Sequence, residues 1–244
     1  PDMVAFVNGI PLILVELKAR DVDVKRAFED NITDYKTAIP HLLWYNAFIL
    51  ISNGRESKIG SMTSGYEHYA DWKKISKENE AGSTTLDTII KGTCDKARLL
   101  DLLENFVLFS VKKGEHIKIV AKNHQYLGVN NAIESFAKRK QNRGRLGVFW
   151  HTQGSGKSYS MIFFTQKILR KFPGNFTFVV ITDRTELDDQ IYQNFQSSGV
   201  VTEEEVQAKS GAHLKQLLRE NHRLVFTIIN KFDTEKGQAY PKLS

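Results

Sequence analysis

The sequence predicts an α/β protein, and three observations carry this prediction. Two β-rich runs, at 3–7 and 10–17, flank an Asn-Gly pair, which is a strong hairpin signal. A short apolar run at 146–150 precedes a glycine-containing loop and a segment with helical periodicity. The apolar runs at 176–182 and 224–229 are separated by two predicted helices. This alternation predicts a doubly wound parallel sheet in the second half of the chain.

The composition fits a globular protein of one large or two ordinary domains. The chain has 244 residues, of which 41% are hydrophobic and 25% are charged. Its one cysteine, Cys94, excludes an internal disulfide framework and fits a reducing compartment. No run of 18 apolar residues is present, so we expect no transmembrane helix, no membrane partner and a cytoplasmic location. The chain lacks an initiator methionine and begins within a predicted strand, so we expect a fragment.

The first hairpin carries charged residues in a pattern that suits metal chemistry. The second run ends in Glu16-Leu17-Lys18, and Glu16 and Lys18 share one face of the predicted strand because they are two residues apart. Asp2 lies at the far end of the partner strand. Two carboxylates can hold Mg²⁺ against a phosphate, and a lysine can orient a water molecule or stabilise developing charge. The alternative is that these are ordinary solvated strand positions.

A metal site of this kind sets a condition on the register of the hairpin. Facing residues of an antiparallel pair have a constant sum of residue numbers, and their side chains lie on the same side. A two-residue Asn8-Gly9 loop gives a sum of 17, which places Asp2 and Glu16 on opposite faces. An even sum is needed. We therefore predict a bulged or three-residue turn, with the two carboxylates close enough to share one cation.

The segment at 22–38 reads as a helix, and its Asn31 and Tyr35 share one face at a spacing of four residues. Pro40 ends this helix. Further elements are predicted in this order: a buried strand at 42–51, an irregular strand-and-loop region at 55–76, an amphipathic helix at 95–109, a helical stripe at 127–136, and helices at 187–196 and 203–219.

A break at residues 112–114 predicts a domain boundary, with one domain at 1–113 and a second at 114–244. The formal net charge of the chain is +6. Between Lys112 and Arg145, nine Lys or Arg residues stand against two Glu residues, a net charge of +7. This segment is either a solvated interdomain stretch or a surface that faces the phosphates of a nucleic acid.

The stretch at 146–158 has the layout of a P-loop, which is a strand, a glycine-containing loop and a helix. Gly154 and Gly156 let the backbone turn tightly and bring amides against phosphate oxygens. Lys157 can neutralise phosphates, and the Ser158 hydroxyl can bind Mg²⁺. The alternative is a chance glycine-rich turn, and His151 stands where the strict pattern has Gly. The expected nucleotide contacts of this loop are Thr152, Gly154, Ser155, Gly156, Lys157 and Ser158.

Taken together, the chain resembles the motor-nuclease (restriction) subunit of type I restriction–modification enzymes over essentially all 244 residues. The blocks that carry the resemblance, in order, are PDMVAFVNGIPLILVELK, HQYLGVNNAIESF, HTQGSGKS, VVITDRTELDDQ and TIINKF. HTQGSGKS resembles motif I of superfamily 2 helicases. The resemblance implies a PD-(D/E)xK nuclease-like α/β domain, followed by a C-terminally truncated, doubly wound (RecA-like) P-loop motor lobe.

The resemblance also implies roles for individual residues. Asp2, Glu16 and Lys18 match nuclease metal-binding and catalytic positions, and Tyr35 matches the Tyr of the family's Q-x-x-x-Y helix, where Asn31 replaces the usual Gln. The implied metal ligands are Asp2, Glu16 and Ser158. Gln125 matches a glutamine that reads adenine through its amide, which donates and accepts at once. The implied DNA contacts are Arg184, Gln190 and Lys231.

The function implied by the resemblance is ATP-driven translocation along double-stranded DNA with Mg²⁺-dependent cleavage, in a bacterial or archaeal cytoplasm. The implied partners are the methyltransferase and specificity subunits of the same complex. No acidic D-E-x-H box is present, so we expect this piece alone to lack full ATPase activity. Two alternatives remain: a superfamily 2 repair or remodelling ATPase with an inactive nuclease-like domain, and a non-catalytic module that tethers partner subunits.

Overall fold

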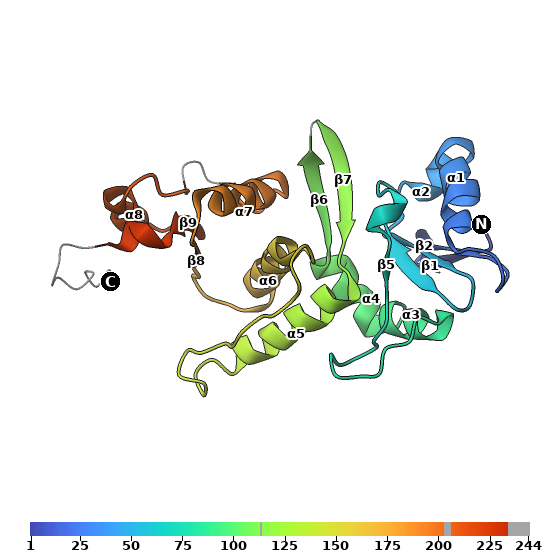
Figure 1. Ribbon diagram of the computed structural model, residues 1–244, viewed down its shortest axis with the longest axis horizontal. Helices are drawn as coiled ribbons and strands as arrows, with labels where there is room; N and C mark the ends of the chain where they lie inside the picture. Colours follow the sequence, from blue (N-terminus) through green and yellow to red (C-terminus); the bar gives the residue numbers. More distant parts are fainter. Residues whose placement is uncertain (113, 203–205, 234–244) are drawn as a thin grey trace. The chain divides into compact units, whose positions relative to one another are not determined.

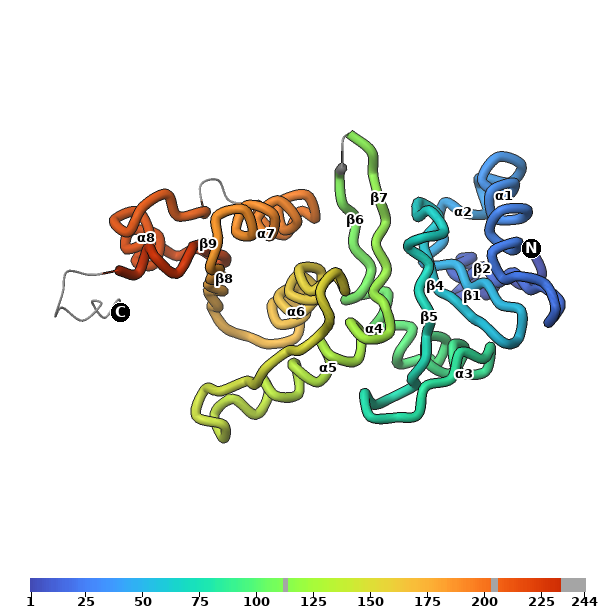
Figure 2. The backbone as a smooth tube through the Cα atoms, in the orientation of Figure 1, coloured from blue at the N-terminus to red at the C-terminus, as the bar shows by residue number. Residues whose placement is uncertain are grey.

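The computed structural model describes residues 1–112, 114–202 and 206–233. The chain divides into two compact units, Pro1–Phe164 and Thr165–Ser244. Figure 1 labels most of the helices and strands, and Figure 2 follows the backbone in the same orientation. Helices and strands are mixed throughout, so the predicted α/β class is confirmed. Within the described residues, no helix has the length and apolar character needed to cross a membrane.

A five-stranded mixed sheet, with the strand order β1-β2-β3-β4-β5, organises the first part of the chain. Strands β2 and β3 are parallel, and the other neighbouring pairs are antiparallel. The strands are β1 (Met3–Val7), β2 (Ile10–Leu17), β3 (Phe48–Ser52), β4 (Ser57–Gly60) and β5 (Ala70–Asp71).

The β1–β2 hairpin has the even register that the metal-site hypothesis needs, but it reaches that register in an unexpected way. The turn is a two-residue one, with Asn8 and Gly9 both at positive φ (50° and 80°), so the predicted bulged or three-residue turn is wrong. A bulge at Leu12 then changes the sum of facing residue numbers from 17 to 18. The Leu12 carbonyl accepts a hydrogen bond from the Ala47 amide at 2.7 Å. From Ala5 back toward the N-terminus, the ladder therefore runs in the register that sets Asp2 opposite Glu16.

The predicted helix at 22–38 is a π-helical segment, η1 (Ala27–Ile32), continued by α1 (Thr33–Ala38). The Thr33 amide bonds to the Phe28 carbonyl five residues back, which is the π-helical pattern. Apolar side chains of this segment pack on one face of the sheet. The buried members of this cluster are Leu14, Val24, Ala27, Ile32, Leu43, Ile49, Ile51 and Tyr69.

The predicted strand at 42–51 is too long, because β3 begins only at Phe48. Pro40 starts a short helix, α2 (Pro40–Leu43), in which its missing amide hydrogen costs no bond. Trp44 and Tyr45 follow and are largely exposed. The Asn46 side-chain amide then donates to the Phe48 carbonyl at 3.0 Å, which fixes the entry into the strand.

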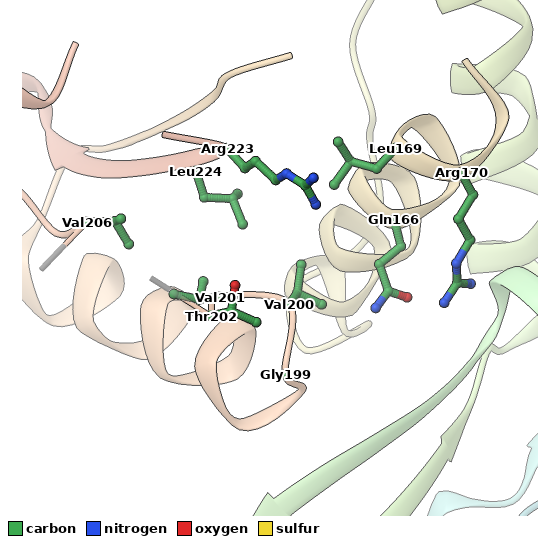
Figure 3. Close-up of a pocket in the computed structure, with 10 residues that line it drawn as sticks. All are labelled: Gln166, Leu169, Arg170, Gly199, Val200, Val201, Thr202, Val206, Arg223 and Leu224. Carbon is green, nitrogen blue, oxygen red and sulfur yellow. The ribbon is translucent and has the colours of Figure 1, made fainter. Parts of the chain in front are cut away.

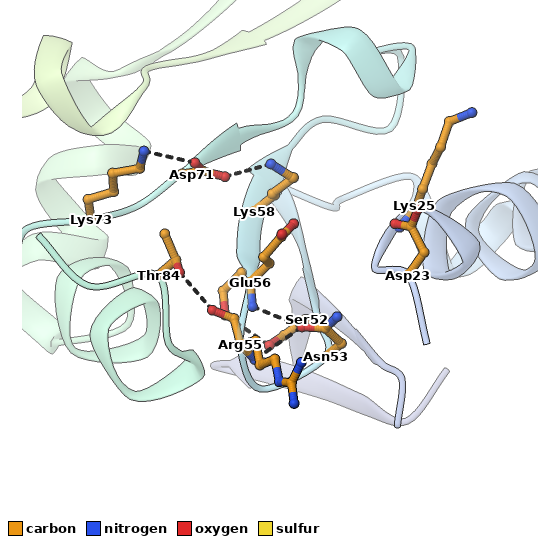
Figure 4. Close-up of polar contacts among 11 residues, drawn as sticks. Asp23, Lys25, Ser52, Asn53, Arg55, Glu56, Lys58, Asp71, Lys73 and Thr84 are labelled. Atoms are coloured by element: carbon orange, nitrogen blue, oxygen red, sulfur yellow. Dashed lines mark hydrogen bonds and ion pairs between the residues drawn. The ribbon is translucent and has the colours of Figure 1, made fainter. Parts of the chain in front are cut away.

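The region at 55–76 contains short strands and loops, as predicted, together with the 3₁₀ turn η2 (Tyr66–His68). An ion-pair network joins its two strands (Figure 4): the Lys58 ammonium lies 2.6 Å and the Lys73 ammonium 3.2 Å from the Asp71 carboxylate. Burial acts to raise the pKa of Asp71, but the bonds from both lysines lower it below its ordinary value. The Thr84 hydroxyl, bonded to the Arg55 carbonyl at 2.7 Å, ties the later loop to the β3–β4 turn.

Two helices follow, α3 (Leu86–Thr93) and α4 (Lys96–Asn105), and then a hairpin of β6 (Val107–Lys112) and β7 (Glu115–Val120). The sequence did not lead us to expect α3. The predicted helix at 95–109 is thus too long at its C-terminal end. The predicted domain boundary falls at the β6–β7 turn, where Gly114 has φ 82°, and residue 113 is outside the described residues. The division into functional domains at 1–113 and 114–244 stays a prediction.

Helix α5 (Asn123–Ala137) includes the predicted helical stripe, and α6 (Lys157–Lys171) begins within the predicted P-loop. The predicted buried strand at 146–150 is wrong. This stretch lacks strand structure, and the side chains of Val148 and Trp150 are 89% and 86% exposed. A strand needs a hydrogen-bonded neighbour, and none of the strands in the described ranges pairs with this stretch.

In the second unit, β8 (Phe178–Thr182) pairs in parallel with β9 (Leu224–Ile228). Helices α7 (Thr185–Ser197) and α8 (Gly211–Leu217) lie between the two strands in sequence. The 3₁₀ turn η3 (Ile229–Phe232) comes directly after β9. The predicted helix at 203–219 is shorter, and residues 203–205 of it lie outside the described part. The parallel pair agrees with an α/β alternation, whereas the full doubly wound lobe stays a prediction.

Candidate functional site

The first candidate site is a ring of polar side chains on β2 and the η1–α1 helix. Glu16 is only 3% exposed, and its carboxylate accepts a hydrogen bond from the Tyr35 hydroxyl at 3.0 Å. The Lys18 ammonium lies 3.8 Å from the Glu16 carboxylate and donates to the Asn31 side-chain oxygen at 2.5 Å. The Asn31 amide nitrogen lies 3.4 Å from the Tyr35 hydroxyl and closes the ring. Each of these four predicted residues thus contacts two of the others.

Local structure explains why these side chains meet. Glu16 and Lys18 project from the same face of the sheet as Leu14, which packs against the η1 segment. Asn31 lies in the π-helical segment, and Tyr35 lies one turn later in α1. The pKa of Tyr35 is raised above its ordinary value, chiefly by burial; the bond from Asn31 lowers it, and the adjoining Glu16 carboxylate raises it further. Tyr35 therefore stays protonated and donates to Glu16 at neutral pH.

Asp2 joins this ring through the register of the hairpin. One of its carboxylate oxygens accepts the Leu17 amide at 2.7 Å, so the side chain lies beside the end of β2. Asp2 is exposed, whereas Glu16 is buried. We call Asp2, Glu16, Lys18, Asn31 and Tyr35 the sheet site. The described part of the chain has no cluster of three or more His, Cys, Asp or Glu side chains that could hold a metal ion.

The second candidate site is the loop from His151 to Ser158, which precedes and opens α6. Gly154 and Gly156 have φ of 77° and 84°, the left-handed conformations that a tight phosphate-binding turn uses. The Lys157 ammonium donates to the carbonyl oxygens of His151 (3.0 Å) and Thr152 (2.9 Å). The lysine is therefore folded onto its own loop. The Ser155 hydroxyl is buried and has no hydrogen-bond partner among the described residues.

Two side chains of the first turn of α5 bond to this loop. The Gln125 amide nitrogen donates to the Gly156 carbonyl at 2.9 Å, and its oxygen accepts the Lys122 amide at 2.9 Å. Gln125 is 3% exposed, so both ends of its amide are engaged inside the protein. An adenine contact by Gln125 stays a prediction. His124, which the sequence reading did not single out, lies 3.0 Å from the Ser155 carbonyl.

We call residues 151–158, together with His124 and Gln125, the loop site. A cavity of about 560 Å³ adjoins it, bounded by α5, the stretch at 146–151 and the start of α6. Its lining is largely apolar, with Lys157 and Glu78 as the charged members. A Cβ at Gly128 would come within 2.7 Å of the Phe149 ring, so a larger residue at this position requires the ring to move.

The remaining predicted residues belong to the second unit. Arg184 and Gln190 are exposed, at the N-terminal end and in the middle of α7. The Lys231 ammonium donates to the Ala208 carbonyl and so fastens η3 to the start of the α8 region. Asp188, which lies in the same sequence block as Arg184 and Gln190, is 1% exposed and accepts a hydrogen bond from the Gln207 side-chain amide at 2.8 Å. Asp188 therefore links α7 to the segment that contains Gln207. DNA contacts by Arg184, Gln190 and Lys231 stay predictions.

A second cavity, of about 300 Å³, lies inside the second unit (Figure 3). It is bounded by the C-terminal half of α6, the loop at 199–202 and the start of β9. Arg170 and Arg223 line it, and the Gln166 side-chain oxygen is buried without a hydrogen-bond partner in the described ranges. None of the predicted site residues lines this cavity.

Comparisons with known proteins bear on both halves of the chain. The family described as Type I restriction enzyme R protein N terminus matches residues 1–68, and the family described as SWI2/SNF2 ATPase matches residues 124–244. The Type I restriction enzyme HindI endonuclease subunit of Haemophilus influenzae is 37% identical over 259 residues, which cover 100% of this chain and 24% of that protein.

A second relative is the Putative type I restriction enzyme MjaIXP endonuclease subunit of Methanocaldococcus jannaschii, which is 32% identical over 273 residues. The match covers 100% of this chain and 25% of that relative. The chain therefore spans about a quarter of the length of these curated relatives. The resemblance drawn from the sequence blocks is confirmed along the whole chain.

Proposed function

Because the chain belongs to the family of type I restriction enzyme endonuclease subunits, we propose that it is part of an ATP-dependent DNA translocase and Mg²⁺-dependent endonuclease. The substrate of the whole protein is double-stranded DNA in this proposal, and its partners are the methyltransferase and specificity subunits of a cytoplasmic complex. The observation that supports the nuclease role best is the closed ring of Glu16, Lys18, Asn31 and Tyr35.

In this proposal the sheet site holds a divalent cation and a phosphodiester. Asp2 and Glu16 fit a Mg²⁺ ion, because they offer hard carboxylate oxygens at facing positions of one hairpin. The cation would stabilise the charge that develops on the scissile phosphate. Tyr35 and Lys18 hold the Glu16 carboxylate in one orientation, and the Lys18 ammonium lies where it can also bind a phosphate oxygen.

The loop site binds the phosphates of ATP in this proposal, with Mg²⁺ at Ser158. The loop turns through Gly154 and Gly156 and leads into the N-terminus of α6, where backbone amides and the helix dipole favour anions. Lys157 now bonds to two carbonyls of its own loop and would exchange them for phosphate oxygens. ATP hydrolysis would supply the free energy of translocation.

The competing function is an ATPase with an inactive nuclease-like domain, which the replacement of Gln by Asn at residue 31 suggests. The shorter side chain nevertheless reaches both Lys18 and Tyr35. This contact favours an active nuclease over the inactive alternative.

A nicking assay tests the proposal. The full-length protein, assembled with its partner subunits, is incubated with supercoiled plasmid, ATP and Mg²⁺. We expect Glu16→Ala to abolish cleavage and to leave ATP hydrolysis intact. The matched control is Glu29→Ala, because Glu29 is an exposed acid that pairs with Lys25 at 2.6 Å. Equal cleavage by the Glu16→Ala variant and the unaltered protein would refute the nuclease assignment.

A further inference from the structure

The first turn of α5 holds two consecutive carbonyls of the loop site. His124 Nε2 lies 3.0 Å from the Ser155 carbonyl, and the Gln125 amide nitrogen lies 2.9 Å from the Gly156 carbonyl. The Lys122 amide fixes the orientation of the Gln125 side chain by donating to its oxygen. A larger residue at Gly156 would be strained, because its φ is 84° and a Cβ there would come within 2.8 Å of the Gln125 nitrogen. The loop and the helix are thus fitted closely to each other.

The chemistry of the acceptor fixes the state of the His124 ring. A carbonyl oxygen cannot donate, so the ring nitrogen that faces Ser155 carries the hydrogen. The ring is half-buried, and burial is the main reason that the pKa of His124 is lowered below its ordinary value. The bond to the Ser155 carbonyl and the charge of Glu78 raise this pKa, whereas His151 and Lys122 lower it further. The neutral ring with hydrogen on Nε2 is therefore the donor at physiological pH.

A second set of contacts holds the other end of the loop. His151 packs edge-on against the His124 ring, with ring centroids 4.8 Å apart and planes at 88°. The His151 Nε2 atom lies 3.5 Å from a Glu78 carboxylate oxygen. The other Glu78 oxygen accepts from the Asn131 amide at 2.9 Å, and Asn131 also belongs to α5. His151, which stands where the strict P-loop pattern has Gly, is thus also tied to α5.

We propose that His124 is a positioning residue of the nucleotide site. By bonding to the Ser155 carbonyl, His124 keeps that oxygen from turning toward the bound phosphates. The carbonyl oxygen would repel the phosphates, so holding it back leaves the loop amides free to face the phosphate oxygens. Ser155 and Gly156 then need no rearrangement when nucleotide binds, which lowers the cost of ordering the loop. This inference rests on the proposed binding of ATP at residues 151–158.

The test measures the dissociation constant of a fluorescent ATP analogue for the full-length subunit. We expect His124→Ala to weaken binding about tenfold, the scale of one well-placed hydrogen bond. His124→Gln should bind within about threefold of the unaltered protein, because its amide nitrogen reaches as far as Nε2 and donates to the same carbonyl. The matched control is His116→Ala in β7, where the histidine is exposed, and it should have no effect.

Lys157→Ala separates this inference from the function on which it rests. Binding by Lys157→Ala that equals binding by the unaltered protein would remove the ATP site, and with it the inference. A Lys157→Ala variant that binds poorly beside a His124→Ala variant that binds normally would overturn the inference alone. If His124→Ala fails to fold, the His124→Gln variant tests the inference instead. A His124→Gln variant with a normal melting temperature and tenfold weaker nucleotide binding would contradict the positioning role.

Discussion

Side chains hold one another at the sheet site, whereas side chains hold the backbone at the loop site. At the sheet site, Glu16, Lys18, Asn31 and Tyr35 contact one another directly. At the loop site, His124, Gln125 and Lys157 all bond to carbonyl oxygens. The first arrangement depends on strand register and helix phase. The second depends on a helix placed beside a loop. The two sites should therefore fail for different reasons, and the first three changes below test this difference, whereas the fourth concerns basic residues outside both sites.

Deleting Ala5 should have the largest effect. The two-residue turn and the Leu12 bulge remain, so the shortened β1 would set Asp2 opposite Val15, on the side away from Glu16. We expect Mg²⁺-dependent nicking to fall by at least about 100-fold, because the proposed metal site loses one carboxylate and with it several kcal/mol of charge stabilisation. Nucleotide binding should not change. Ala5→Ser keeps the residue count and is the control: it should retain most of the nicking activity, and a comparable loss there would discredit the register argument.

Tyr35→Phe should have the next largest effect. It removes the hydroxyl that donates to Glu16 and contacts Asn31, at a cost of about 0.5–1.5 kcal/mol. We expect the nicking rate to fall about tenfold, since the Glu16 carboxylate is no longer held in one orientation. Tyr45→Phe is the control, because Tyr45 is 63% exposed. An unchanged nicking rate in Tyr35→Phe would show that Lys18 alone orients Glu16.

Gly128→Ala probes the loop site. The new methyl group would lie 2.7 Å from the Phe149 ring and 3.2 Å from the His151 ring, so both rings must move outward. Alanine also gains about 1 kcal/mol of helix propensity over glycine, which offsets part of the lost packing. We therefore expect a small change in melting temperature and a threefold to tenfold loss of nucleotide affinity (order of magnitude, from loss of one or two packing contacts). A large loss of nicking activity at saturating ATP would contradict the independence of the two sites.

The smallest effect should come from the exposed basic residues after α5. Lys140, Arg143 and Arg145 are exposed, whereas Lys118 of the same basic segment is buried and bonded to the Asn46 carbonyl. Neutralising the three exposed residues should reduce the slope of log K against log salt for DNA by up to ~0.9 per phosphate contact. Lys91→Gln is the control, because Lys91 pairs with Asp87 at 2.9 Å. An unchanged slope would mean that this surface only faces solvent.

The sequence was enough to predict both candidate sites in outline, because each depends on short patterns. The alternation of β2 places Glu16 with Lys18, and the helical spacing places Asn31 with Tyr35. The register argument also predicted that the numbers of facing residues in the hairpin would have an even sum. It could not place the irregularity at Leu12, because the acceptor role of that carbonyl depends on Ala47, which is far away in the sequence.

Other errors have the same origin in tertiary context. The apolar stretches at 42–51 and 146–150 both read as strands. In the first, Pro40 and Asn46 shorten the strand from its N-terminal side. In the second, no strand of the described ranges offers a partner. The helix α3 was missed because its glycine, Gly92, lowers helix propensity, although Gly92 is needed there to make room for the buried Trp72 ring.

The π-helical segment η1 has a consequence for how distant relatives are compared. It holds one more residue than an α-helical path of the same length, and each residue turns an α-helix by about 100°. A relative that lacked a single residue between Ala27 and Asn31 would follow the plain α-helical path and would still turn its tyrosine toward the glutamate. A relative that kept this residue but formed a regular α-helix would turn its tyrosine away from the glutamate by about 100°. A one-residue difference in the spacing of the E-x-K and N-x-x-x-Y patterns is therefore compatible with the same site, provided that the helix type changes with it.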